Sequence, residues 1–583
     1  MVTVNISNIL KSLRNSTRRF PVTISVSTVL VIMLITLMEK GSTFDPDLRD
    51  MLLRVAIIIA LGIPLSVCIK FIYEKRNIDN KLHKVIGYFI GAVILIIYFF
   101  LLLQEIDWVS IARYIGVSIF LYLAFFYIPW INRKEGYEYY IVDVLSSFIV
   151  TVIYSFVLFI GIITMLFTIV QLFDVELPEN LISYIFLIIA GIFAVSLFLA
   201  RIPEINKEYQ NAQYPKVLKV LLLYIVIPLI IAYTIILYVY FIKIIITANW
   251  PRGLVFHLVL WYSVISVIVL FFITPMLKDN KLVYKFKVFF PKAILPILAM
   301  MFVAMWIRIK AYGITENRYY GLILGIWVLG VMLYFSLKKK LKNIVIFVSL
   351  SIISLISVFG PLSGFSISKL NQNSRFEAIL KKNQMLVGDS IQPNRNVSQE
   401  DKEEISMILQ YFNTRHSFED VKYLPDDFYF NDMEDVFGFP FTAKEPDKVD
   451  NFYYYTEAGA RKIIDVKEYD YFVESLSLLE GPTELENITI SYNRNNYELR
   501  ILRNDEVLFE RDLKNFANLI LNEYSTQENK FGSFLDQEKA TFIDENENVK
   551  VKIIITSLTG QKDKANNENL IEHMEFYMFV KVK

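Results

Sequence analysis

Long apolar segments, separated by short polar ones, fill the first 360 residues of the chain. A run of roughly 18 or more apolar residues can cross the hydrocarbon core of a bilayer as an α-helix, and we therefore predict about eleven membrane-spanning helices. The pattern places them at approximately residues 20–38, 51–73, 85–104, 109–131, 143–173, 181–201, 218–246, 254–277, 289–307, 319–337 and 344–360.

The first apolar run, Phe20–Met38, follows basic residues and could be mistaken for a secretory signal. The residues after it, Glu39-Lys40-Gly41, offer no small-residue cleavage site. We therefore expect this run to be retained as the first membrane span.

The pattern changes abruptly after Gly360-Pro361, where polar residues begin to interrupt the apolar ones at short intervals. Ser398 precedes a predicted helix, because a serine hydroxyl followed by acidic residues commonly caps a first turn. Apolar residues at helical spacing mark its buried face: Ile405, Ile408, Leu409 and Phe412. Alternation predicts strands at 488–492, 497–501, 507–509, 549–555 and 574–582, with a helix at 513–524.

This order of elements predicts an α-helical polytopic membrane domain followed by a soluble α+β domain with an antiparallel sheet. We expect the membrane domain over residues 1–360, a linker over 361–395 and the α+β domain over 396–583. About two hundred residues after the last span are ample for a separate hydrophobic core.

Composition strengthens the assignment to the membrane. Hydrophobic residues make up 55% of the chain and aromatic residues 15%, and the mean hydropathy is +0.44. The lipid bilayer is therefore the first expected partner. A net charge of +1 conceals a basic first part and an acidic last part. Because nucleic-acid phosphates would repel the acidic part, we expect no nucleic-acid partner.

Lysine and arginine concentrate in alternate loops, such as those around Lys75, Lys278 and Lys338. The positive-inside rule assigns these loops to the cytoplasm. An inside N-terminus and an odd number of spans then make residues 361–583 extracytoplasmic. Heavy use of Ile, Lys, Asn, Tyr and Phe is typical of a low-GC bacterium, so we expect a multi-pass protein of the bacterial inner (cytoplasmic) membrane.

Short motifs along the spans resemble a bacterial family of polytopic membrane proteins catalogued as domain of unknown function forty-one fifty-three. They lie at residues 61–65, 158–161, 198–203, 238–244, 249–253, 308–320 and 359–361, with weaker likeness at 464–466 and 469–471. The resemblance implies a polytopic membrane domain with an extramembrane tail. It implies no activity and no catalytic residues.

A polar insert between two predicted spans, Arg308–Tyr320, is the main candidate for a site. Basic residues here and at neighbouring outer helix ends could attract an anionic ligand. The candidate ligand-binding residues are Lys243, Trp250, Arg252, Arg308, Tyr312, Glu316 and Arg318. A structural interpretation competes with this one: Thr315 can cap the following helix, Glu316 suits a helix N-terminus, and Arg308 and Lys310 can snorkel from a helix end.

Two weaker patterns suggest other chemistry. Pro64 and Pro228 both lie in Ile-Pro-Leu within oppositely directed spans, as in the broken helices of inverted-repeat transporters, although simple kinks are commoner. The first outer loop carries Asp45, Asp47 and Asp50, and membrane glycosyltransferases use acidic residues in such a loop. The loop is short for those enzymes, and plain solvation also explains it.

We find no pattern for a cofactor, a metal site or a catalytic group, because the four histidines are scattered and nucleotide-binding glycine motifs do not occur. The sequence therefore favours a membrane protein that binds or transports a ligand, or engages a partner protein, at the outer face. An envelope enzyme of the glycosyltransferase type, and a sensor acting through a partner, stay open as alternatives. An enzyme is less favoured than a binding protein.

The topology predicts that a reporter active only outside the cytoplasm, fused after Lys583, will be active in cells. A reporter active only inside the cytoplasm should be silent at the same position. The opposite result would mean that the number of spans is even.

Overall fold

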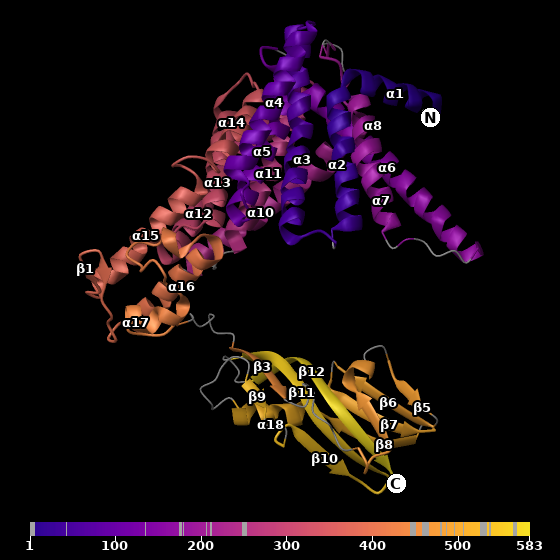
Figure 1. Ribbon diagram of the computed structural model, residues 1–583, viewed down its shortest axis with the longest axis vertical. Coiled ribbons are helices and arrows are strands. Elements are labelled where there is room, and N and C mark those ends of the chain that lie inside the picture. The colour runs from indigo at the N-terminus through magenta and orange to yellow at the C-terminus, as the bar shows by residue number, and fades with distance from the viewer. Residues whose placement is uncertain are drawn as a thin grey trace. The chain divides into compact units, whose positions relative to one another are not determined.

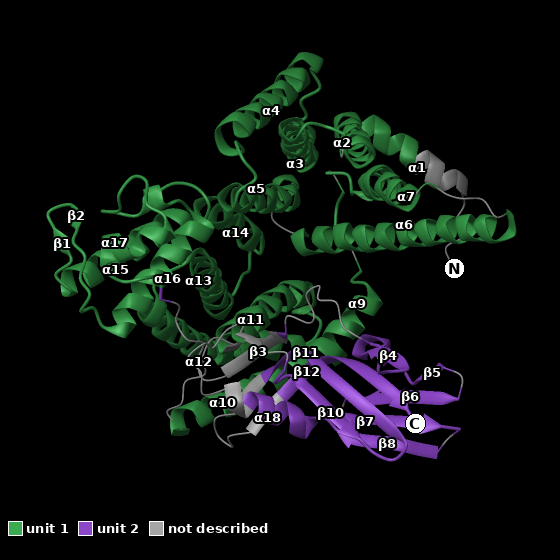
Figure 2. Ribbon diagram, turned by 60° about the horizontal axis from the view of Figure 1, so that its bottom comes forward, with its two compact units in different colours: residues 1–441 green, residues 442–583 purple. Residues whose placement is uncertain are grey.

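The computed structural model describes residues 6–41, 43–133, 136–173, 178, 180–205, 207–209, 213–247, 254–442, 450–456, 466–478, 481–485, 487–494, 496–504, 506–524, 533–535, 538–563 and 568–583. The chain forms two compact units, Met1–Phe441 and Thr442–Lys583, which Figure 2 distinguishes by colour. The boundary lies later than the start at residue 396 that the sequence suggested for the soluble domain.

Within the described part of the first unit, ten helices are long and apolar enough to cross a membrane. They are α2 (Pro21–Lys40), α3 (Pro46–Arg76), α4 (Lys81–Leu102), α5 (Trp108–Tyr127) with η1 (Ile128–Trp130), α6 (Tyr137–Phe173), α7 (Leu181–Ile188) continuing through η2 (Ile189–Ala194) into α8 (Val195–Arg201), α9 (Lys216–Val220) continuing through η3 (Leu221–Val226) into α10 (Ile227–Thr247), α11 (Leu254–Ile273), α12 (Lys281–Tyr312) and α13 (Glu316–Leu337). A shorter apolar helix, α14 (Ile344–Ile356), follows them, and α1 (Ile6–Arg19) precedes them. The predicted polytopic helical domain is therefore confirmed.

The core of this unit is centred on α11, α12 and α13, which pack against one another. Val259, Ile294, Met301 and Val328 are fully buried there. Buried hydroxyls in these helices form hydrogen bonds with carbonyls of their own helix. Ser263 Oγ, for example, donates to the carbonyl of Val259 at 2.6 Å. By contrast, α6 exposes a nearly continuous apolar surface, as a helix that faces lipid chains must.

The helices pass through their prolines without breaking. Helix α3 continues through Pro64, and α12 continues through Pro291 and Pro296. Pro228 is the second residue of α10, which begins where η3, a segment with the wider π-helical turn, ends. Proline lacks a backbone N–H and crowds the carbonyl one turn earlier, and a wider turn accommodates both effects. The local geometry thus fits bends in continuous helices.

Three α-helices and a short hairpin of the first unit follow the last apolar helix (Figure 1). Helix α15 (Gly364–Lys382) and the hairpin of β1 (Leu386–Val387) and β2 (Ser390–Ile391) occupy the segment that we expected to be a linker. Helix α16 (Gln399–Arg415) begins as predicted, with the Ser398 hydroxyl accepting from the Asp401 N–H at 3.3 Å. The short α17 (Met433–Phe437) closes the group.

These elements share a small hydrophobic core of their own. Phe376 and Leu380 of α15 pack with Leu409 and Phe412 of α16 and with Phe437 of α17, and all five are fully buried. Helix α15 also packs against α13. The extramembrane helices are therefore part of the same compact unit as the spans.

The second unit contains two sheets and one described α-helix, α18 (Lys514–Tyr524). The larger sheet has the order β4 (Tyr471–Glu474), β12 (Glu568–Val582), β11 (Val549–Asp563), β3 (Asp450–Thr456) and β9 (Ser533–Leu535), with β10 (Thr541–Glu545) also pairing with β11. The smaller sheet has the order β5 (Thr483–Leu485), β6 (Ile488–Asn493), β7 (Glu498–Arg503) and β8 (Glu506–Asp512). All pairs are antiparallel except β3 with β9.

The predicted α+β domain with an antiparallel sheet is therefore confirmed. Leu499 and Ile501 of the smaller sheet and Val551 and Met578 of the larger sheet are fully buried in one core. Ala517 of α18 joins the same core. Alternation along the sequence located β6, β7, β8, β11 and β12, and it missed β3, β4, β5, β9 and β10, most of which are short.

We predict that a fragment of residues 442–583 folds alone, because its core draws on this unit only. A longer fragment starting at residue 396 should be less soluble, because it exposes the apolar face of α16 that α15 covers, and each large side chain left uncovered costs about 1.5–3 kcal/mol. Circular dichroism during heating and binding of a hydrophobic dye would measure both effects. Loss of the cooperative transition in the short fragment would contradict the prediction.

Candidate functional site

The turn between α12 and α13 is built around Gly313, which has a positive φ of 69°. A Cβ added there would lie 2.8 Å from Asn371 Oδ1, from Gln372 Nε2 and from Arg375 Cδ. Glycine is thus required both by the backbone conformation and by the close approach of α15. The polar insert Arg308–Tyr320 therefore packs directly against an extramembrane helix.

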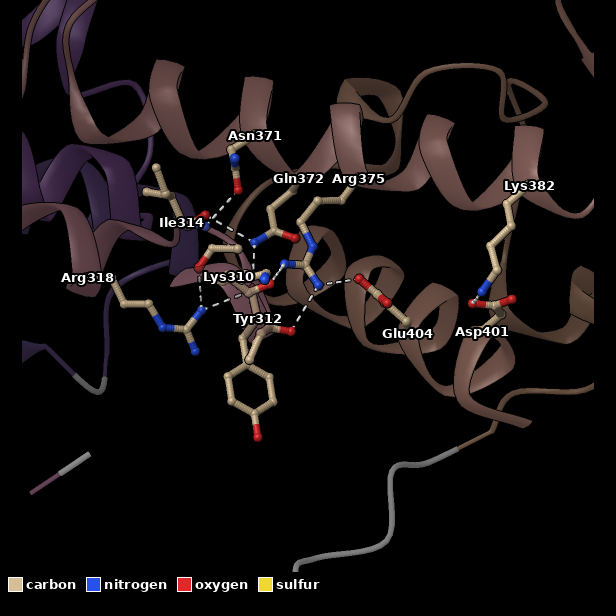
Figure 3. A network of polar contacts seen from close by, with 12 residues as sticks. Lys310, Tyr312, Ile314, Arg318, Asn371, Gln372, Arg375, Lys382, Asp401 and Glu404 are labelled. Atoms are coloured by element: carbon tan, nitrogen blue, oxygen red, sulfur yellow. Dashed lines mark hydrogen bonds and ion pairs between the residues drawn. The ribbon is translucent and has the colours of Figure 1, made fainter. Parts of the chain in front are cut away.

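Two arginines bind the carbonyls at the C-terminal end of α12 (Figure 3). Arg318 Nη1 donates to the carbonyls of Tyr312 at 3.0 Å and Gly313 at 2.8 Å. Arg375 Nη2 donates to the carbonyl of Ala311 at 3.1 Å and also pairs with Glu404 of α16. The last carbonyls of a helix lack partners within it and carry partial negative charge, so guanidinium groups stabilise this end.

Two amides of α15 complete the contact. Asn371 Oδ1 accepts from the N–H of Ile314 at 2.7 Å, and Gln372 Nε2 donates to the carbonyl of Ile314 at 3.0 Å. We call Asn371, Gln372, Arg375 and Arg318 the carbonyl clamp. Through it, α15 is fixed to the backbone of the α12–α13 turn.

A second contact, fully buried, joins the first residue of α13 to the end of α16. Glu316 Oε1 lies 2.7 Å from His416 Nε2 and accepts from the Tyr411 hydroxyl at 2.5 Å. The Tyr411 hydroxyl also lies 2.9 Å from His416 Nε2. The side chains of His416 and Glu316 are 1% and 3% exposed. Burial and the adjacent Glu316 carboxylate raise the pKa of Tyr411, so its hydroxyl keeps its proton and donates.

Aromatic and cationic groups enclose this buried triad of Glu316, Tyr411 and His416. Phe365 of α15 packs edge-on against the His416 ring. Arg113 of α5 lies over the Phe365 ring, with its guanidinium carbon 5.9 Å from the centroid of that ring. Arg415 lies 4.1 Å over Trp108, at the start of α5. These contacts join four helices: α5, α13, α15 and α16. We call the carbonyl clamp, the buried triad and these surrounding contacts together the junction.

The structure brings only some of the predicted ligand-binding residues together. Tyr312 and Arg318 stack, with the guanidinium carbon 5.5 Å from the ring centroid, and Arg308 lies close enough to Arg318 for their charges to repel. Glu316 is buried against His416, away from solvent. Lys243 is exposed on α10, and among the described residues its side chain makes no hydrogen bond or ion pair with the others. Trp250 and Arg252 lie outside the described residues.

Two structural expectations from the sequence have different outcomes. Thr315 stands at the N-cap position of α13, but its side chain makes no capping hydrogen bond, so the expected cap is wrong. Asp50, which we expected in a loop, lies inside α3 and pairs with Arg54 one turn later at 3.0 Å, which agrees with a structural role for this acidic residue.

Sequence reasoning missed most of the junction. Asn371, Gln372 and Arg375 fell in the segment expected to be a linker, and His416 was one of four scattered histidines. A signal was present in α15, because residues at positions i, i+1 and i+4 form one polar stripe on a helix. The pairing of Glu316 with His416 spans 100 residues and has no local signature.

Taken together, the fold and these contacts define a multi-pass membrane protein in which α15 and α16 are fixed to the ends of α12 and α13. The family described as "Domain of unknown function (DUF4153)" matches residues 28–388, well over half of the chain, and the chain belongs to this family. An uncharacterized protein of Pasteurella multocida (strain Pm70) is 23% identical over 461 residues, which cover 76% of each chain. No solved structure matches the chain.

We predict that Glu316→Gln weakens the attachment of α16 to α13, because a neutral amide replaces the carboxylate that accepts from Tyr411 and faces His416. An amide oxygen is a weaker acceptor than a carboxylate, and hydrogen bonds to charged groups contribute about 1.5–3 kcal/mol against about 0.5–1.5 kcal/mol for neutral ones. Hydrogen exchange of the purified full chain should show faster exchange in α16. Asn317→Ala, at the exposed neighbouring position, is the matched control and should leave the exchange unchanged. Equal protection in both variants would contradict the role of the triad.

Proposed function

We propose that this membrane protein binds a ligand, or engages a partner, at the outer face of a bacterial cytoplasmic membrane. The proposed site is the surface around the α12–α13 turn and the adjoining part of α15. The observation that supports it most is that two of the cations there bind backbone carbonyls and two do not. Arg318 and Arg375 hold backbone carbonyls, whereas the side chains of Arg308 and Lys310 have no hydrogen bond or ion pair with the described residues.

The clamp makes this surface suitable for binding. A ligand site needs side chains held in place before the ligand arrives, because ordering them afterwards reduces affinity. The carbonyl clamp and the buried triad fix α15 and α16 against α13 through hydrogen bonds at both ends of the junction. The unpaired cations thus lie beside a rigid support.

A sensor that acts through a partner protein is the second candidate. The buried triad connects α13, a span, directly to α16, an extramembrane helix. A change in α16 would therefore reach the membrane through a short chain of hydrogen bonds. This observation favours the sensor over an envelope enzyme, whose carboxylates or nucleophile would have to face the outer surface.

Mass spectrometry of the full chain, purified in mild detergent, tests the binding function. We predict that wild-type protein retains a small molecule or partner that the double variant Arg308→Gln/Lys310→Gln loses. The double variant Lys339→Gln/Lys340→Gln removes the same charge from exposed lysines in the loop after α13 and should retain it. Identical bound species in all three preparations would refute a site at this turn.

A further inference from the structure

We propose that a cluster of four cations at the end of α12 binds the phosphate of an anionic lipid headgroup. The cluster consists of Arg318 of α13 and Arg375 of α15, which bind the last carbonyls of α12, together with Arg308 and Lys310, which stand in the last two turns of α12. We call it the α12 cationic cluster. This inference rests on the proposed function, because it names the ligand class of the same surface.

The first argument is electrostatic. Arg308 and Arg375 both lie close enough to Arg318 for their charges to repel its own. Arg375 is only 19% exposed, and the described carboxylate that neutralises it is Glu404. Like charges in a partly dehydrated setting repel more strongly than they do in water. A bound anion would relieve this repulsion, and the cluster retains an excess of positive charge to attract one.

The second argument comes from side-chain N–H donors of the cluster that have no acceptor among the described residues. A guanidinium has five N–H donors, and Arg318 uses only Nη1 in its contacts with carbonyl oxygens. Arg375 Nε is buried and has no partner among the described residues. Arg308 and Lys310 contribute their side-chain donors in full. Guanidinium groups bind phosphate oxygens in pairs, so a phosphate suits this donor set better than a monodentate anion.

The third argument concerns depth in the membrane. Trp306, two residues before Arg308, is 68% exposed, and the neighbouring Ile307 and Val303 are exposed as well. Exposed tryptophan on a span marks the boundary between hydrocarbon and headgroups. Arg308 and Lys310, two and four residues further along the helix, are therefore at the depth of lipid phosphates. A lipid phosphate reaches this position from the side, whereas a soluble anion must come from water.

The charge of the cluster also selects among lipids. A phosphatidylcholine headgroup carries a quaternary amine, which the four cations would repel. A phosphatidylglycerol headgroup carries the same phosphodiester without a positive charge. The cluster should therefore prefer phosphatidylglycerol.

Native mass spectrometry of the full chain in detergent, titrated with phosphatidylglycerol or phosphatidylcholine, tests this proposal. We expect wild-type protein to prefer phosphatidylglycerol and Arg308→Gln/Lys310→Gln to bind it about tenfold more weakly, since charge-assisted hydrogen bonds are lost. Neither side chain has a folding partner among the described residues, and size-exclusion chromatography will confirm that the variant is monodisperse. Lys339→Gln/Lys340→Gln should change the affinity by less than about twofold.

Each other outcome overturns the inference. An equal loss in both double variants would indicate general attraction of lipid to surface charge. Displacement of phosphatidylglycerol by millimolar inorganic phosphate, with retention of phosphate itself, would indicate a soluble anion. If a species without phosphorus is retained through Arg308 and Lys310, the lipid inference fails and the proposed binding function stands. If nothing depends on these residues, both fail.

Discussion

The carbonyl groups at the C-terminal end of α12 impose the constraint on which the junction depends. A helix leaves its last carbonyls without internal partners, and carbonyls that neighbouring helices cover cannot be left to water. Here Arg318 and Arg375 satisfy the carbonyls of residues 311–313, and Gln372 takes that of Ile314. Gly313 gives these side chains the room to approach. The position of α15 follows from these bonds.

The buried triad adds a second kind of restraint. Its three polar groups are shielded from water, where a hydrogen bond is strong and an unpaired group is costly. Tyr411 and His416 both reach the same oxygen of Glu316, so displacement of α16 would leave several buried groups unsatisfied at once. The clamp holds α15 and the triad holds α16, and their shared core makes the two restraints cooperative.

Elements with a strong local period were predictable, and contacts between distant residues were not. The spans, the cap at Ser398 and the alternating strands β6, β7 and β11 each carry their own signal. Helix α15 was missed because its buried residues Phe376 and Leu380 stand in a predominantly polar segment. The strand pair β3 and β9 was missed because it joins residues far apart along the chain, such as Tyr454 and Ser533, and this pairing leaves no local signal. The charge of the polar insert identified candidate site residues. It did not identify the residues of α15 and α16 that contact them.

Net charge proved a poor guide to which groups meet at the turn. The insert carries three basic residues and one acidic residue, so charge alone would favour an acidic neighbour. Instead, α15 brings another cation, Arg375, to the turn, because the carbonyl oxygens of α12 attract guanidinium groups whatever the surrounding net charge. Local dipoles and hydrogen bonds outweigh the long-range field at contact distance, where that field is screened by solvent and salt. The consequence is an accumulation of positive charge of which Glu404 neutralises only a part. Such an excess is costly for folding alone, and this cost is the physical reason to look for an external anion there.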